Sequence, residues 1–164
     1  MAEKLITPEL IRQLEVHMAG LNRSVSLMLK RGEHQKREEL VDFLKAITGT
    51  SKKLSFHETD SDSLRSPISF SLETENKNTG IAFSGIPSGH EFTSLILAIL
   101  QAGGGDFKLD QATVESITKI SEPLKFEIFV SLDCRNCPDV VQSVNKLSLL
   151  NPNISSEMID GGLF

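Results

Sequence analysis

The chain contains no tryptophan and no tyrosine, and it has only two cysteines among 164 residues. Its apolar packing must therefore rest on nine phenylalanines and on aliphatic side chains. It also lacks an apolar run of membrane-spanning length, and its first residues lead straight into a polar, amphipathic segment. We therefore expect no membrane span and no signal peptide. A chain with these properties and a single cysteine pair is expected in the cytoplasm, where such a pair is more often catalytic than a structural crosslink.

A basic surplus is also absent, because the formal net charge is −5. No basic stripe or aromatic platform accompanies that charge, which argues against a nucleic-acid partner. Lys30, Arg31, Lys36 and Arg37 fit a solvated helix start better than a phosphate site. With 39% hydrophobic and 24% charged residues, the composition is that of an ordinary globular protein.

Three kinds of cofactor site have no support in the sequence. The four histidines are scattered, with no His-x-x-x-His spacing to complete a four-ligand zinc site, so we expect no metal. The glycine triplet at residues 103–105 follows no strand and precedes no Lys-Ser/Thr, so it is better explained as a linker than as a phosphate loop. No Gly-x-Gly-x-x-Gly follows a strand, and we therefore expect neither FAD nor NADH to bind this chain.

Both cysteines lie in the motif Cys134-Arg135-Asn136-Cys137-Pro138. The motif follows a predicted strand over residues 126–131 and opens a predicted helix over residues 134–150. Unpaired N–H groups and the positive dipole end of a helix favour a thiolate, which is the attacking species in disulfide exchange. This setting favours a role for the pair in redox exchange. The less favoured alternatives are that the pair forms half of a zinc site or a structural disulfide. Cys134, in the exposed turn, is the expected nucleophile, and Cys137, one turn into the helix, is the expected resolving thiol.

The remaining pattern is a repeated plan. Residues 1–103 predict the order helix, strand, helix, strand, strand, strand, helix, with predicted elements at 7–21, 24–30, 33–48, 53–58, 68–72, 81–83 and 88–101. This is the plan of a thioredoxin fold. After the glycine linker, residues 104–164 restart it with a helix at 111–120, a strand at 125–131, the cysteine-bearing helix and a strand at 154–159. A shift of about one hundred residues places Glu33 and Lys36 near the cysteine positions, so the first half has the fold without the thiols.

The fold class expected is thus α/β, with tandem thioredoxin-like folds, the second truncated after its βαβ unit. A two-stranded βαβ unit is a poor independent core, and its second strand would leave an open edge. That edge could be covered by the first half or by a second copy of the chain. It could also stay uncovered. The last two cases predict a homodimer or local lability after about residue 123.

Three stretches resemble the N-terminal domain of the flavoprotein (F) subunit of bacterial alkyl hydroperoxide reductase. They are Phe83-Ser84-Gly85-Ile86-Pro87-Ser88-Gly89-His90-Glu91-Phe92-Thr93-Ser94-Leu95, Ser131-Leu132-Asp133-Cys134-Arg135-Asn136-Cys137-Pro138-Asp139-Val140-Val141-Gln142, and Leu150-Asn151-Pro152-Asn153 with Ile159-Asp160-Gly161-Gly162. The resemblance runs over nearly the whole chain. It implies fused thioredoxin folds of which only the second carries active cysteines.

The resemblance also implies a function and partners. Electrons would pass from NADH to FAD and a second Cys-x-x-Cys in the flavoprotein body, then to Cys134 and Cys137, then to the disulfide of a peroxiredoxin. Glu91 would lie near the redox pair as a candidate acid/base, although by its position alone a carboxylate facing a helix dipole is the simpler interpretation. His90 is expected to cap or pack.

One departure from that family keeps other interpretations open. The proline that family members place opposite the cysteine pair would lie beyond Phe164, and it shapes the groove where substrate disulfides dock. A fragment of a longer protein, or a gene product that has lost its donor module, would explain this departure. Two other functional interpretations remain, a non-catalytic remnant or interaction domain and a generic thioredoxin- or glutaredoxin-like reductant.

Overall fold

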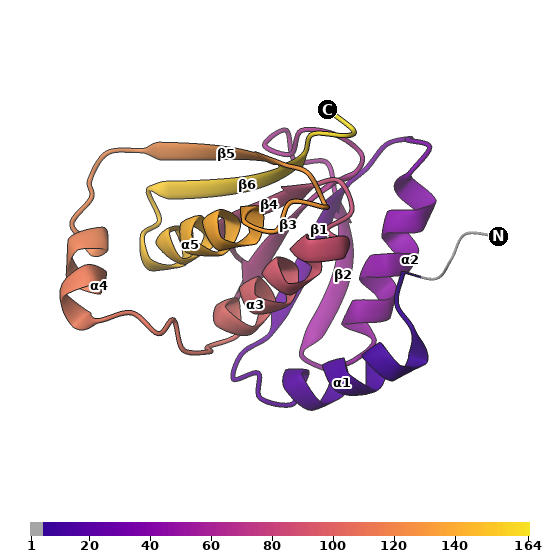
Figure 1. Ribbon diagram of the computed structural model, residues 1–164, viewed down its shortest axis with the longest axis horizontal. Helices are drawn as coiled ribbons and strands as arrows, with labels where there is room; N and C mark the ends of the chain where they lie inside the picture. The colour runs from indigo at the N-terminus through magenta and orange to yellow at the C-terminus, as the bar shows by residue number, and fades with distance from the viewer. Residues whose placement is uncertain (1–4) are drawn as a thin grey trace.

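The computed structural model describes residues 5–164 (Figure 1). Helices and strands alternate along most of the chain. The elements are α1 (Pro8–Met18), β1 (Val25–Lys30), α2 (Arg37–Thr48), β2 (Leu54–Thr59), β3 (Ser69–Thr74), β4 (Lys77–Ser84), the short 3-10 helix η1 (Gly89–Glu91), α3 (Phe92–Ala102), α4 (Gln111–Thr118), β5 (Leu124–Val130), α5 (Cys137–Leu150) and β6 (Ile154–Asp160).

All strands belong to one six-stranded sheet with the order β2-β1-β3-β4-β6-β5. β3 is antiparallel to both of its neighbours, and the other adjacent pairs are parallel. The join between the two halves is the parallel pair β4–β6, in which Ile81 lies opposite Ser156 and Phe83 opposite Met158. The sheet is therefore continuous across residues 103–105.

This pairing shows how the second half covers its open strand. β6 has β4 on one side and β5 on the other, so the first half of the same chain protects it. Of the three possibilities stated above, the structure contains the first. An open edge at β6 is therefore no ground for a homodimer or for local lability. Within residues 5–164, the strands with an unpaired outer edge are β2 and β5.

Helices α2, α3 and α5 cover one face of the sheet (Figure 1). The crossovers β1–α2–β2 and β5–α5–β6 run in the same direction across the sheet, so right-handed connections place both helices on one face. Alternation in β1 agrees, because Val25, Leu27 and Leu29 are fully buried under the helices while the residues between them are partly exposed. The same alternation explains the strand pattern in the sequence.

One hydrophobic core spans both halves. Phe70 and Phe83 stack with ring centroids 5.3 Å apart, and Phe43 of α2 meets Phe92 of α3 edge to face. Val141 and Met158 from the second half belong to the same buried cluster. A shared core and a shared sheet make the second half part of the packing of the first.

The repeat of the plan is more regular than its sequence suggests. α5 begins at Cys137 and α2 at Arg37, β6 begins at Ile154 and β2 at Leu54, so each pair lies one hundred positions apart. The expected elements are all present, with differences at their ends. β4 begins at Lys77, because Glu75 and Asn76 adopt positive φ angles and form a two-residue hairpin turn that the sequence suggested was longer.

Candidate redox site at the start of α5

The cysteine pair lies between the end of the edge strand β5 and the first turn of α5. Cys134 and Cys137 form a disulfide, with their Cα atoms 5.5 Å apart. Cys137 is the first residue of α5, not one turn into it as expected, and Cys134 lies in the preceding turn, where its N–H donates to the carbonyl of Ser131 over 2.9 Å. Pro138 is in the first helical turn, where its missing N–H removes no helical hydrogen bond.

The helix start provides a donor to one sulfur. The backbone N–H of Cys137 points at Sγ of Cys134 over 3.2 Å. A donor at that distance stabilises negative charge on the sulfur that accepts it, as does the positive end of the helix dipole. The charged neighbours Asp133, Arg135 and Asp139 are all exposed, so solvent screens their influence. The arrangement favours Cys134 as the thiolate when the disulfide is reduced.

Glu91 is the other unusual group near this turn. Its side chain is fully buried, and neither carboxyl oxygen has a hydrogen-bond partner. It occupies the residue before α3 and makes no capping hydrogen bond to that helix. Burial raises the pKa of Glu91 above its ordinary value, while the Ser94 hydroxyl and the charge of His90 lower it. A buried carboxyl with a raised pKa is a typical proton donor or acceptor.

The turn η1 holds Glu91 against the loop before the cysteines. The N–H of His90 donates to the carbonyl of Leu132 over 3.2 Å. Gly89 has a φ of +57°, and a Cβ there would lie 2.8 Å from that carbonyl, so glycine permits the close approach. Residue 90 thus connects the two segments through its backbone. Its side chain is exposed and does not cap or pack, contrary to expectation.

The equivalent turn of the first half contains no thiol. The structural offset places His34 at the position of Cys134 and Arg37 at that of Cys137, one residue beyond the expected Glu33 and Lys36. Nδ1 of His34 accepts the N–H of Lys36 over 3.0 Å, and the Arg37 guanidinium binds the carbonyls of Lys30 and Pro67. These side chains close the turn structurally. They have no redox chemistry to offer.

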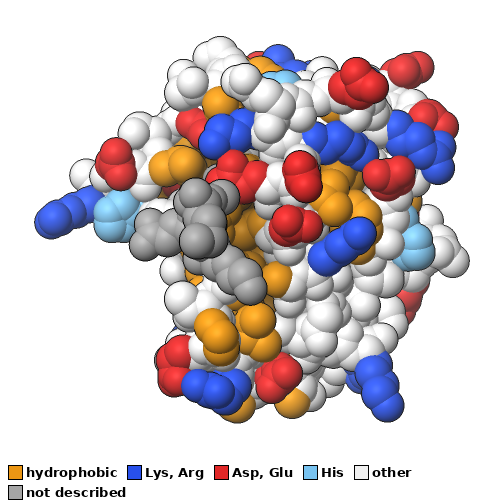
Figure 2. All heavy atoms as spheres, turned by 90° about the vertical axis from the view of Figure 1, so that its right-hand side faces the viewer, with side chains coloured by type: hydrophobic (Ala, Val, Ile, Leu, Met, Phe, Trp, Pro, Cys, Tyr) orange, Lys and Arg blue, Asp and Glu red, His pale blue; other side chains and the backbone are white. Residues whose placement is uncertain are grey.

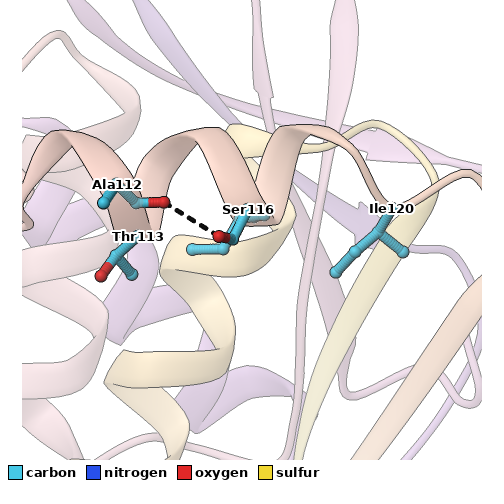
Figure 3. Close-up of a pocket in the computed structure, with 5 residues that line it drawn as sticks. Ala112, Thr113, Ser116 and Ile120 are labelled. Carbon is cyan, nitrogen blue, oxygen red and sulfur yellow. Dashed lines mark hydrogen bonds between the residues drawn. The ribbon is translucent and has the colours of Figure 1, made fainter.

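Two hollows lie away from the cysteines. One is a shallow depression along α4 lined by Ala112, Thr113, Ser116, Ile117 and Ile120 (Figure 3), at the end of the sheet where β5 begins. The other lies between the segment that includes Leu5 and α2, on the face where Figure 2 shows apolar side chains among charged ones. Neither is lined by a cysteine.

Two further classes of site find no support in the part of the chain that is described. Residues 5–164 contain no cluster of three His, Cys, Asp or Glu side chains that could hold a metal ion. Over the same residues, no helix is both long enough and apolar enough to span a bilayer.

The fold and the disulfide at the start of α5 define a thioredoxin-like protein with a Cys-x-x-Cys pair. A protein disulfide oxidoreductase from Aeropyrum pernix has the same architecture, with a TM-score of 0.84 over 99% of this chain and 77% of its own, at 19% identity. That likeness concerns the fold alone. A scan against family models finds no match.

Closer relatives identify the family. The NTD_N/C domain of alkylhydroperoxide reductase AhpF from Enterococcus faecalis has a TM-score of 0.88 at 32% identity, over 97% of this chain and 82% of that one. The F subunit of alkyl hydroperoxide reductase is 41% identical in Staphylococcus aureus and 40% identical in Pseudomonas aeruginosa, over 98% of this chain. The chain belongs to the AhpF family of alkyl hydroperoxide reductases and corresponds to the N-terminal domain of that family. It spans about 31% of the length of these curated relatives.

Sequence reasoning found the cysteine pair, and the resemblance pointed to Glu91. The sequence did not single out Ser94 and Gln142, whose hydrogen bond links α3 to α5, although both lie inside the stretches that carry the resemblance. The signal was present in part, because Ser94 follows Glu91 by one helical turn. Their contact across two helices had no sequence pattern to reveal it.

Proposed function

We propose that this chain is the thiol–disulfide exchange module of an alkyl hydroperoxide reductase flavoprotein, and that it passes electrons from the flavoprotein body to a peroxiredoxin disulfide. The observation that carries the proposal is the disulfide at the first turn of α5, with the N–H of Cys137 directed at Sγ of Cys134. The family relationship supports it. We place the reaction in the cytoplasm, where thiols are kept reduced.

The proposed reaction balances as two exchanges. The Cys134 thiolate attacks one sulfur of the peroxiredoxin disulfide, which forms a mixed disulfide and releases the other peroxiredoxin sulfur as a thiolate that takes up a proton. Cys137 then loses its proton and attacks Sγ of Cys134. This step forms the internal disulfide and releases the second peroxiredoxin thiol. A dithiol of the flavoprotein body then reduces the Cys134–Cys137 disulfide by the same chemistry, so each exchange passes two electrons and two protons toward the peroxiredoxin.

Glu91 is the group that we propose exchanges the proton in these steps. It is buried beside the loop that ends in Cys134, and burial raises the pKa of its carboxyl. A carboxyl with a raised pKa stays protonated closer to neutral pH, so it can give a proton to a leaving thiolate and take one from an attacking thiol.

Cofactors belong to the other part of the relay in this proposal. FAD and NADH would bind the flavoprotein body, and this chain would hold neither. Absorption spectroscopy of the purified chain tests that point, because bound flavin would absorb visible light, which the protein itself does not. For a homodimer, the surface that we propose is the outer edge of β5, which can be tested by light scattering with and without a proline at Glu127.

The experiment that tests the exchange uses the reduced chain and an oxidised peroxiredoxin. Acid quenching followed by mass spectrometry counts the thiols on each protein over time. The proposal predicts that two thiols appear on the peroxiredoxin for each disulfide formed in this chain. A reduced chain whose thiols stay reduced beside the oxidised peroxiredoxin would instead support a non-catalytic interaction domain. Equal rates with unrelated protein disulfides would support a generic reductant.

A further inference from the structure

Helices α3 and α5 are joined by a side-chain hydrogen bond. Nε2 of Gln142 donates to Oγ of Ser94 over 3.2 Å. Ser94 is fully buried and follows Glu91 by three residues, so the two side chains share one face of the helix start. The bond therefore connects the helix that begins at Cys137 with the turn that carries Glu91.

The hydrogen of the Ser94 hydroxyl is not used in the bond with Gln142. A serine hydroxyl has a single O–H hydrogen, and its oxygen can accept while that hydrogen is donated elsewhere. Because Gln142 donates to Oγ, the Ser94 hydrogen is available for another acceptor. Within residues 5–164 no hydrogen bond of ordinary geometry uses it, and none reaches either oxygen of the buried Glu91 carboxyl, although the Ser94 hydroxyl lies near enough to that carboxyl to lower its pKa.

We propose that Gln142 and Ser94 form a bridge that positions the Glu91 carboxyl beside the cysteine pair. Gln142 orients the Ser94 hydroxyl, and the hydroxyl donates its hydrogen to the Glu91 carboxylate. Among the described residues, no hydrogen bond joins Ser94 or Gln142 to either sulfur, so both are positioning residues. The inference deepens the proposed function, because it rests on the proton role assigned there to Glu91.

Few of the charged groups around Glu91 influence its pKa, so the effect of the Ser94 hydroxyl on that pKa should be measurable. α3 contains no charged residue. The charged groups on the other neighbouring elements are His90 in η1, Asp133 and Arg135 in the loop, Asp139 and Lys146 on α5, and Arg37, Glu38, Glu39, Asp42 and Lys45 on α2, while Cys134 and Cys137 are held in the disulfide and do not titrate. Among them, only His90 joins burial and Ser94 in setting the pKa of Glu91. Removing the Ser94 hydroxyl should leave burial less opposed, and the pKa should rise further.

The test measures the titration of Glu91 directly. The oxidised chain is labelled with ¹³C, and the Cδ resonance of Glu91, assigned by its loss in Glu91→Gln, is followed against pH. Ser94→Ala and Gln142→Leu are each expected to shift the titration midpoint upward. Ser143→Ala is the matched control, because Ser143 is exposed on α5, next to Gln142, and its hydroxyl donates to the carbonyl of Asp139. The titration midpoint of Glu91 in Ser143→Ala should equal that in the unmodified chain.

Two results would overturn the proposal. If the midpoint stays in place in both Ser94→Ala and Gln142→Leu, there is no bridge. If it moves only in Ser94→Ala, Gln142 does not orient the hydroxyl. Backbone ¹H–¹⁵N spectra of each variant show that it is folded, and a third variant, Gln142→Met, covers a Gln142→Leu protein that fails to fold. It removes the amide donor at a similar length without adding a charge, and should also raise the midpoint.

A second readout separates this inference from the proposed function. The rate of peroxiredoxin reduction by the reduced chain is measured against pH for Glu91→Gln, Ser94→Ala and the double variant. With the bridge acting through Glu91, Ser94→Ala shifts the profile and has no further effect in the Glu91→Gln background. A rate profile that is unchanged in Glu91→Gln would overturn the proton role of Glu91, while upward midpoints in the titration would still establish the bridge.

Discussion

Cys134 and Cys137 share one turn of chain but differ in what surrounds their sulfurs. The sulfur of Cys134 accepts a backbone N–H, whereas no hydrogen bond to the sulfur of Cys137 is found among the described residues, and Cys137 packs against the hydrophobic core. Hydrogen bonding favours the charged form of a thiol and apolar surroundings disfavour it. The two cysteines are therefore expected to have different roles.

Serine substitutions separate those roles. Under the proposed function, Cys134→Ser is expected to reduce the transfer of electrons to an added oxidised peroxiredoxin to the background rate, because the attacking thiolate is gone. Cys137→Ser should still attack but cannot release the partner, so a mixed disulfide accumulates and is visible by non-reducing electrophoresis and mass spectrometry. Retained activity in Cys134→Ser would contradict the assignment of the nucleophile.

The buried Glu91 carboxyl makes a prediction about stability. Its pKa in the folded chain is raised by burial, so the folded state binds more protons than the unfolded state between the two pKa values. The free energy of unfolding should therefore fall as pH rises from below the ordinary value of 4.5 through the folded-state pKa. Glu91→Gln should remove this fall and be the more stable protein at neutral pH.

Chemical denaturation followed by circular dichroism at a series of pH values measures the effect. Glu38→Gln, on exposed surface of α2, is the control and should keep the pH dependence of the unmodified chain. A Glu91→Gln protein that is less stable than the unmodified chain at neutral pH would contradict the raised pKa, because it would show that the surroundings of the ionised carboxyl stabilise it by more than burial costs.

At the scale of elements, the contact that joins the two halves depends on one glycine. Gly80 lies within β4 with a φ of +83°, and a Cβ there would lie 2.7 Å from the carbonyl oxygen of Ile154, where β6 begins. Both the backbone angle and the space disfavour any other residue. Gly80→Ala is expected to lower the free energy of unfolding by about 1–3 kcal/mol. Gly20→Ala, with ordinary contacts and no positive φ, should change it by less than about 1 kcal/mol.

A charged contact strengthens the same join on the open face of the sheet. The Arg65 guanidinium binds both carboxylate oxygens of Glu157 on β6, at 2.9 and 3.1 Å, and lies 3.2 Å from Glu127 on β5. The Ser84 hydroxyl donates to the same Glu157 carboxylate. These contacts raise the pKa of Arg65, so it stays charged.

Truncation of this arginine should cost more than truncation of an ordinary surface arginine. Arg65→Ala is expected to destabilise the chain by about 1–2 kcal/mol, because a bidentate pair is lost and Glu157, largely buried, loses its counter-ion. The loss should shrink as salt is added. Arg12, paired with Glu9 with both side chains 69% exposed, is the control, and Arg12→Ala should cost no more than about 0.5 kcal/mol. If Arg65→Ala and Arg12→Ala lower the free energy of unfolding equally, the Arg65–Glu157 pair contributes no more than an exposed ion pair.

The difference between single elements and the contacts between them also explains how much of the structure the sequence predicts. It predicted every helix and strand, because an element such as α2 or β1 carries its own periodicity and end signals. The repeat and the strand-to-helix position of the cysteines followed from the same local patterns. It left the partner of β6 open, because two segments some seventy residues apart each show only that they are strands. The bridge from Gln142 to Ser94 is hidden for the same reason, since it depends on how two helices pack.

For the whole molecule, the consequence is that the second half depends on the first for its stability. β6 is an interior strand between β4 and β5, and Val141 and Met158 are fully buried in the core that holds Phe70 and Phe83. A βαβ unit alone would have neither neighbour nor core. The two thioredoxin-like halves predicted at residues 1–103 and 104–164 therefore share one sheet. The glycine segment between them also packs back, since the carbonyl of Gly103 accepts the N–H groups of Asn22 and Arg23.

One cooperative unit has a measurable signature. In a parallel interior strand, successive N–H groups alternate between the two neighbouring strands, so the amides of β6 should be as protected from hydrogen exchange as those of β1. Exchange followed by mass spectrometry resolves the two strands as separate peptides. The amides of α4, a short and mostly exposed helix at the end of the sheet, provide the fast-exchanging reference.

The same unit should unfold in a single step. Because the chain has neither tryptophan nor tyrosine, intrinsic fluorescence gives little signal, and far-ultraviolet circular dichroism with pulse-labelled exchange is the suitable pair of probes. We expect one transition, with peptides from β1 and β6 losing protection at the same denaturant concentration. Loss of β6 protection while β1 remains protected would mean that the β4–β6 pairing opens by itself, and that the second half is a separable unit after all.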